Sequence, residues 1–176
     1  KYASMKFFIY TFTASVLMLV GILVMYFNTA DSIFSGSLTG HHFNLVEMTE
    51  QARVSGLIAS EGLRHFVWLL LLIGFATKMP SVPVHTWLPD AHVQAPTAGS
   101  MILAGVMLKM GAYGFLRVAV AMFPESTLTF VPLLVFLGMA SLVYGSVVCL
   151  GQTKFKIIVA YKYVSHIGLI FIWIAT

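Results

Sequence analysis

Three lysines and a histidine lie in apolar stretches of the sequence, where ionisable side chains are rare. Lys78 and Lys109 end or interrupt hydrophobic runs, and Lys162 precedes His166 by four residues in a third run. A charged lysine at the middle of a bilayer costs about 2.5 to 3.5 kcal/mol on insertion scales, so such residues face a protein interior or water. Burial disfavours the ammonium form, which lets a lysine take up and release a proton. The pattern predicts a proton-conducting path.

Lys109 is the sharpest of these features because it lies near the middle of a long apolar run. The alternative role is a packing lysine satisfied by backbone carbonyls, since snorkelling from mid-span is geometrically hard. Tyr113 follows one turn later and is expected to hydrogen-bond a water molecule. Arg117 nears the far end of the run, where arginine more often anchors a helix than conducts protons.

Lys78 coincides with a predicted break in its helix. The apolar run 66–77 has 12 residues. If the helix enters the membrane near Leu63, Lys78 lies about 22 Å along it, still inside the hydrocarbon layer. Pro80 and Pro83 follow, and proline removes a backbone donor. Lys78 would then occupy a carbonyl-rich helix end, which favours its cation. The alternative is an interfacial lysine that ends a short helix.

Three histidines and a lysine lie near these features. We expect His85 and His166 to take part in the relay, whereas His92, Lys162 and the nearby Tyr113 are secondary candidates. His85 and His92 lie beside the predicted break, and Lys162 and His166 share one helix face because they are four residues apart. Histidine titrates near neutral pH and suits a proton relay. The alternative for each histidine is a hydrogen-bonded packing role, and Lys162 is close enough to its helix start to snorkel.

The acidic residues all lie outside the apolar cores of the predicted spans. Lys78 and Lys109 therefore lack an evident carboxylate partner in this chain. An unpaired buried cation is expensive, so the partner is expected from a missing segment or another subunit. The six acidic residues are Asp31, Glu47, Glu50, Glu61, Asp90 and Glu125.

The elements that position these residues must be membrane helices. Hydrophobic residues make up 59% of the 176-residue chain, and charged residues only 9%, against about 25% in a soluble domain. We expect an all-α, polytopic membrane helix bundle with about five spans, one of them broken. The expected spans are 7–27, 63–79 with a half-helix over 84–96, 97–122, 127–151 and 157–176, with an extramembrane loop over 28–62 that holds a short helix near 45–56 and the solvated His41 and His42.

Several classes of function are disfavoured by the sequence. The only cysteine is Cys149, so no disulfide framework exists. The basic residues are scattered despite a net charge of +4, so no nucleic-acid patch is expected. No nucleophile–base set, phosphate loop, cofactor motif or metal-type Cys/His spacing appears. Because the sequence begins at Lys1, we expect an internal fragment or one piece of a split protein.

The stretch KMPSVPVHTWLPDAHVQAPTAGS from Lys78 to Ser100 continues as ILAGVMLKMGAYGFLR to Arg117. It resembles the chain-4 type of antiporter-like subunit in respiratory NADH–ubiquinone oxidoreductase (complex I). YKYVSHIGL at 161–169 fits the same family, and KFFIY at 6–10 is a weaker match. Where this family commonly reads AYSSVSH, the chain has AYKYVSH, so Lys162 and Tyr163 replace two small residues.

The resemblance implies a place within a larger inverted-repeat, antiporter-like fold of about fourteen membrane helices. This chain would form the sixth to tenth. Lys78 matches the lysine that pairs with a glutamate on the preceding helix, a segment not in this sequence. Lys109 matches the lysine on the central hydrophilic axis, and His85 and His166 match histidines on or near it.

The resemblance also implies partners and setting. The other complex I membrane subunits and the remaining part of the same subunit are the expected partners, together with the lipid bilayer. NADH, FMN, iron–sulfur clusters and ubiquinone belong on other subunits, and no cofactor is expected in this chain. The low charge and high Phe and Met content favour the mitochondrial inner membrane over a bacterial plasma membrane. A secondary cation/proton antiporter and a structural fragment of a split subunit remain alternatives.

Overall fold

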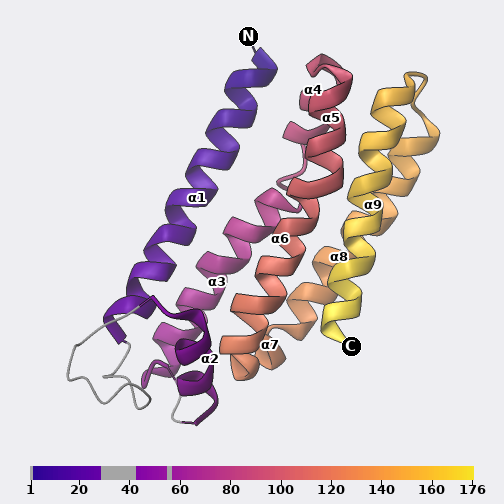
Figure 1. Cartoon of the computed structure of the whole chain (residues 1–176). Helices are drawn as coiled ribbons and strands as arrows, with labels where there is room; N and C mark the ends of the chain where they lie inside the picture. The colour runs from indigo at the N-terminus through magenta and orange to yellow at the C-terminus, as the bar shows by residue number, and fades with distance from the viewer. Residues whose placement is uncertain (1, 29–42, 55–56) are drawn as a thin grey trace.

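The computed structural model describes residues 2–28, 43–54 and 57–176, and the regular elements within these ranges are all helical. The long helices lie side by side, with α1 at one edge, α8 and α9 at the other, and the remaining helices between them (Figure 1). The all-α prediction is therefore confirmed. Asp31, His41 and His42 lie outside the described residues. The helices are α1 (Tyr2–Asn28), α2 (Leu45–Val54), α3 (Glu61–Lys78), α4 (Trp87–Gln94), α5 (Thr97–Ile102), α6 (Leu108–Gly114), α7 (Pro124–Thr129), α8 (Val131–Leu150) and α9 (Phe155–Ala175).

Within the described ranges, four helical stretches are long and apolar enough to cross a membrane. They are Tyr2–Asn28, Thr97–Val120, Val131–Leu150 and Phe155–Ala175. The second stretch joins α5 and α6 through two π-helical segments, η1 (Leu103–Met107) and η2 (Phe115–Val120). A further pair, α3 and α4, forms the broken helix, because α3 ends at Lys78 and helical structure resumes only at Trp87.

One boundary differs from the sequence-based expectation. The span expected over 127–151 is preceded by a separate short helix, α7, and the long helix α8 begins at Val131. Pro132 lies in the first turn of α8, where the missing backbone donor has no intrahelical partner to lose. The chain therefore turns at Phe130 before it enters the bundle again.

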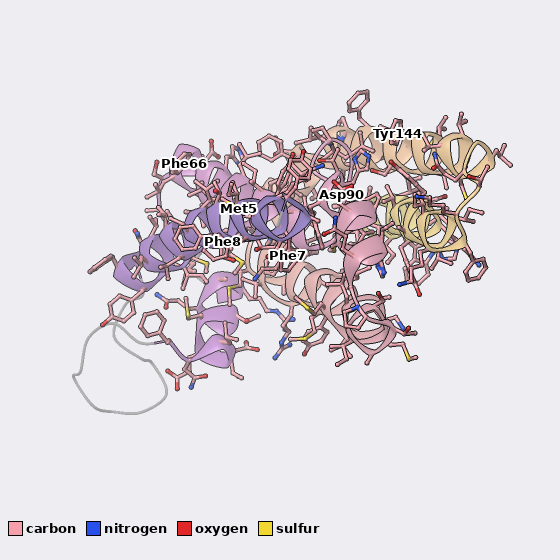
Figure 2. All side chains as sticks on the ribbon, turned by 90° about the horizontal axis from the view of Figure 1, so that it is seen from above. Met5, Phe7, Phe8, Phe66, Asp90 and Tyr144 are labelled. Carbon is pink, nitrogen blue, oxygen red and sulfur yellow. The ribbon has the colours of Figure 1, made fainter. Side chains whose placement is uncertain are left out.

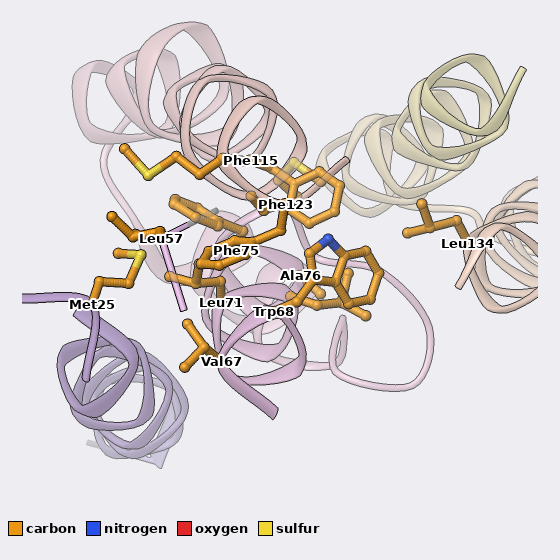
Figure 3. Close-up of a cluster of buried hydrophobic side chains, with 14 of the residues drawn as sticks. Met25, Leu57, Val67, Trp68, Leu71, Phe75, Ala76, Phe115, Phe123 and Leu134 are labelled. Atoms are coloured by element: carbon orange, nitrogen blue, oxygen red, sulfur yellow. The ribbon is translucent and has the colours of Figure 1, made fainter. Parts of the chain in front are cut away.

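Aromatic side chains fill the core between α3 and the stretch that includes η2 and α7 (Figure 3). The buried Trp68 ring stacks on Phe130 at 5.0 Å between centroids and meets the edge of Phe115 at 5.9 Å. The Trp68 indole Nε1 donates to Thr127 Oγ1 at 3.0 Å. This buried contact satisfies the polar atom of an otherwise apolar ring, and it fixes α3 against α7.

Helices α8 and α9 approach each other closely because small residues face across their interface. A Cβ atom built on Gly168 would lie 2.5 Å from the Gly138 carbonyl oxygen, and one on Gly145 would lie 2.8 Å from the Ser165 nitrogen. Membrane helices use such small residues to bring their backbones together. The pair therefore provides a rigid wall beside the broken helix.

Candidate functional site

Lys78 lies at the end of α3 beside a cavity of about 450 Å³. Its side chain is half-buried, and no carboxylate of the described residues forms an ion pair with it. The carbonyl end of α3 favours its cation. The carbonyl oxygens of this last turn accept hydrogen bonds from the Met79 and Ser81 nitrogens and, at Thr77, from the Trp87 indole at 3.0 Å. The cavity is lined by Phe7, Thr11, Ser15, Phe75, Lys78, Trp87, Met107, Met110 and Gly111.

The non-helical backbone after Lys78 is covered by neighbouring helices. Ser141 of α8 accepts a hydrogen bond at Oγ from the Val82 nitrogen at 3.0 Å. On the opposite side, Thr86 Oγ1 donates to the Tyr10 hydroxyl of α1 at 3.1 Å. Irregular backbone at membrane depth requires such protein cover. The break is thus built into the packing of α1, α3 and α8.

Lys109 lies in α6, between the π-helical segments η1 and η2. Single π-helical turns often occur at functional sites, and no pattern in the sequence predicts them here. The side chain of Lys109 is exposed within this chain. Gly111 and Gly114 lie on the opposite face of α6, and this face packs closely against Met79 and Phe75 of the broken helix. Lys109 is therefore on the face that none of the described helices covers. Tyr113, 68% exposed, lies beside Lys109 on the uncovered face.

His166 and Lys162 are also exposed, on the side of α9 that faces away from α8. The buried Ser165 between them contacts Ser146 of α8 at 3.0 Å. Neither His166 nor Lys109 forms a hydrogen bond or ion pair with another described residue. The structure therefore does not join these two residues to Lys78, and it leaves them on surfaces that other protein or lipid would cover.

His85 and His92 are the buried titratable groups of the site, each 4% exposed. Both ring nitrogens of His85 and Nε2 of His92 lack a hydrogen-bond partner. The His85 ring meets Tyr144 at 4.9 Å and Tyr161 at 6.2 Å between centroids. His92 stacks on Tyr163 at 6.2 Å, so one of the two residues that depart from the family wording packs directly on a candidate relay histidine.

An ion pair between Lys6 and Asp90 is the feature that sequence reasoning missed. The Lys6 Nζ lies 2.8 Å from the Asp90 Oδ2 and ties the start of α1 to α4. From above, Asp90 lies between α1 and the α8–α9 pair, which carries Tyr144 (Figure 2). The residues are 84 positions apart, so no local pattern could pair them. The sequence does indicate that Lys6 and Asp90 lie on the same side of the membrane, because successive helices in an up-and-down bundle run in opposite directions.

A polytopic helical bundle with a helix broken after an intramembrane lysine has the architecture of antiporter-like transport subunits. The whole chain, residues 1–176, matches the model of the family described as NADH:quinone oxidoreductase/Mrp antiporter, TM. The chain belongs to this family.

The relatives confirm the resemblance drawn from the motifs around Lys78 and Lys109. A Rhodobacter capsulatus protein named NADH-quinone oxidoreductase subunit M is 44% identical over 169 residues, which cover 95% of this chain and 32% of that protein. The Arabidopsis thaliana NADH-ubiquinone oxidoreductase chain 4 is 42% identical over 168 residues, with 96% and 30% covered. This chain thus spans about a third of the length of the curated relatives it matches.

A solved structure agrees with the sequence relatives. A chain of the respiratory complex I from Thermus thermophilus with bound NADH superposes with a TM-score of 0.74 at 30% identity. The superposition covers 96% of this chain and 33% of that one. The chain is therefore similar in both fold and sequence to a membrane subunit of a larger assembly.

Proposed function

We propose that this chain is part of a proton-translocating membrane subunit of an NADH:ubiquinone oxidoreductase in the respiratory chain. The observation that carries the proposal is Lys78, which ends α3 beside a cavity bordered by α1. A cation in such a position needs a carboxylate partner. The cavity has room for one from the remaining part of the subunit, supplied by a glutamate on the preceding helix.

Each site residue has a role in this proposal. Lys78 exchanges its ion-pair partner when quinone reduction elsewhere changes the charge state, and Lys109 then gains or loses a proton. His85 and His166 pass the proton along the relay, whereas Lys162, Tyr113 and His92 are secondary. The exposure of Lys109 and His166 fits this role, because a relay must meet water or protein groups outside this chain.

The surroundings follow from the same proposal. NADH, FMN, iron–sulfur clusters and ubiquinone are bound by other subunits, while this chain makes and breaks no covalent bonds. The other membrane subunits and the lipid bilayer cover its exposed apolar faces, which include Leu150, Phe155 and Trp173. We place the assembly in the mitochondrial inner membrane, with the bacterial plasma membrane as the alternative.

Replacing Lys109 tests the proposal. Lys109→Ala in the full-length subunit should strongly reduce the number of protons pumped per electron in reconstituted membranes, because a positioned proton carrier is lost. Lys154→Ala is the matched control, since Lys154 is an exposed lysine in the loop before α9. An unchanged proton-to-electron ratio in Lys109→Ala would exclude the relay role.

A second candidate function is a secondary cation/proton antiporter, because the family description includes the Mrp antiporters. Purification of the native assembly separates the two. Co-purifying flavin and iron–sulfur subunits support the first function, and their absence from an active cation-exchanging complex supports the second. A purely structural fragment would keep pumping after Lys78 and Lys109 are neutralised together.

A further inference from the structure

We propose that the Lys6–Asp90 ion pair positions the half-helix α4 and sets the charge that His85 experiences, so that the pair controls proton passage through His85. This inference rests on the proposed function and adds two residues to it. Lys6 and Asp90 act through His85 and are therefore positioning residues. The ion pair would be a second switch, separate from the one at Lys78.

The ion pair is a specific contact between distant parts of the chain. The Nζ to Oδ2 distance is 2.8 Å, and the side chains of Lys6 and Asp90 are 21% and 41% exposed. A charge-assisted hydrogen bond of this length is strong in partly dehydrated surroundings. It spans from α1 to α4 and has no competing carboxylate among the described ion pairs of Lys6.

His85 is a group on which such a pair can act. Its two ring nitrogens are buried without a hydrogen-bond partner, and buried polar atoms of this kind call for a water or a functional explanation. The rings of Tyr144 and Tyr161 lie against it. Both tyrosines carry hydroxyl groups that can donate or accept a hydrogen bond, so His85 has groups nearby that could exchange a proton with it.

The charges of the pair reach the His85 cluster. Lys6 acts electrostatically on His85, and both Lys6 and Asp90 act on Tyr161. With the pair closed, the Lys6 cation still acts on His85, and the Asp90 anion 2.8 Å from it offsets part of this charge. When Asp90 moves away from Lys6, the uncompensated Lys6 cation opposes a positive charge on His85 more strongly. The groups that act on or contact His85 are thus Lys6 on α1, Tyr144 on α8 and Tyr161 on α9, and Asp90 on α4 is paired with Lys6.

The ion pair is also connected to His85 through the backbone of α4. The Leu88 nitrogen donates to the His85 carbonyl oxygen at 3.0 Å, so His85 is joined to the first turn of α4. Asp90 lies in that same turn. At its far end, α4 is held by the Lys156 Nζ, which donates to the Ala95 carbonyl oxygen at 3.2 Å. Thr86 and the Trp87 indole also hold this turn, through Tyr10 of α1 and the Thr77 carbonyl oxygen. Release of Lys6 from Asp90 therefore removes one of the contacts that position the turn carrying His85.

Substitutions that neutralise Lys6 or Asp90 one at a time in the intact complex test this inference. They should shift the pH profile of proton pumping in opposite directions. Lys6→Met leaves the Asp90 anion, which favours protonated His85, so the pH profile of proton pumping should move to higher pH. Asp90→Asn leaves the Lys6 cation, so the profile should move to lower pH. Lys6→Arg keeps the charge and should keep the wild-type profile. Each variant should pump fewer protons per electron than wild type except Lys6→Arg.

A double-mutant cycle with His85→Gln shows whether the effect passes through His85. Lys6→Met should add little to His85→Gln, because coupled residues are non-additive. Additive losses with unmoved pH profiles would reduce the pair to a structural anchor and overturn the inference. If the single variants do not assemble, the charge-swapped Lys6→Asp/Asp90→Lys variant decides. It should assemble and move the profile to higher pH, and an unmoved profile would overturn the inference.

The same set separates this inference from the proposed function. If Lys109→Ala leaves the proton-to-electron ratio unchanged, the proposed relay fails. If Lys109→Ala lowers that ratio while the Lys6 and Asp90 variants leave the pH profile unmoved, only the role of the ion pair fails.

Discussion

The broken-helix region and the outer face around Lys109 carry similar ionisable side chains in opposite settings. At the break, His85 is buried against Tyr144 of α8 and Tyr161 of α9, and Lys78 is half-buried beside a cavity that α1 and α6 help to line. On the outer face, Lys109 and His166 are exposed and have no partner among the described residues. The first region is largely built by this chain, whereas the second needs partners from outside it. Substitutions in the two regions should therefore have different consequences.

Removal of the Lys78 charge should reduce proton pumping more than any other substitution described below. A small effect would contradict the division of the molecule into these two regions. Lys78→Met in the full-length subunit should lower proton pumping by at least about tenfold, as expected for a positioned proton-transfer group. Assembly of the variant is checked separately, because the proposal pairs Lys78 with a glutamate from the remaining part of the subunit, and loss of the lysine leaves that carboxylate unpaired. Proton uptake by reconstituted vesicles measures the result.

Lys78→Arg is the matched control because it keeps the cation but cannot release a proton. It should preserve assembly and lose pumping. If Lys78→Arg pumps like the wild type, the lysine supplies only a charge to the break and does not itself exchange protons.

Alanine substitutions at two glycines test whether the α8–α9 wall beside the first region is tightly packed and the face around Lys109 is open. Gly168→Ala should destabilise the α8–α9 pair by about 2 to 3 kcal/mol, because the new Cβ would lie 2.5 Å from the Gly138 carbonyl oxygen and 2.6 Å from the Leu142 nitrogen. Gly105→Ala, near Lys109, meets nothing within 4 Å and should be neutral or slightly stabilising. The melting temperature of the purified complex measures both.

Equal losses of melting temperature in Gly168→Ala and Gly105→Ala would contradict the division into a packed and an open region. A loss confined to Gly105→Ala would show that the partner covering the outer face packs more tightly on it than α9 packs on α8.

Sequence patterns predicted the helical class and the break at Lys78 because both depend on local physics. Long apolar runs require helices in a bilayer, and Pro80 with Pro83 forces α3 to end. The patterns could not place Asp90 against Lys6, because that contact depends on how α1 packs on α4. They could not show that Lys109 points outward either. An apolar run gives a helix but does not say which face its neighbours cover.

The adjacent residues Lys162 and Tyr163 give the finest test of the comparison, with the smallest expected effect. Tyr163 stacks on the buried His92 of the first region, whereas Lys162 is exposed on α9. Tyr163→Ser removes the ring contact and should cost about 0.5 to 1.5 kcal/mol of stability. Lys162→Ser should leave stability within about 0.5 kcal/mol, as for most surface changes. Denaturant titration of the purified complex, followed by tryptophan fluorescence, compares the two. A larger loss of stability from Lys162→Ser than from Tyr163→Ser would show that a partner outside this chain binds Lys162. The replacement of two small residues by Lys162 and Tyr163 would then serve that contact instead of the packing of His92.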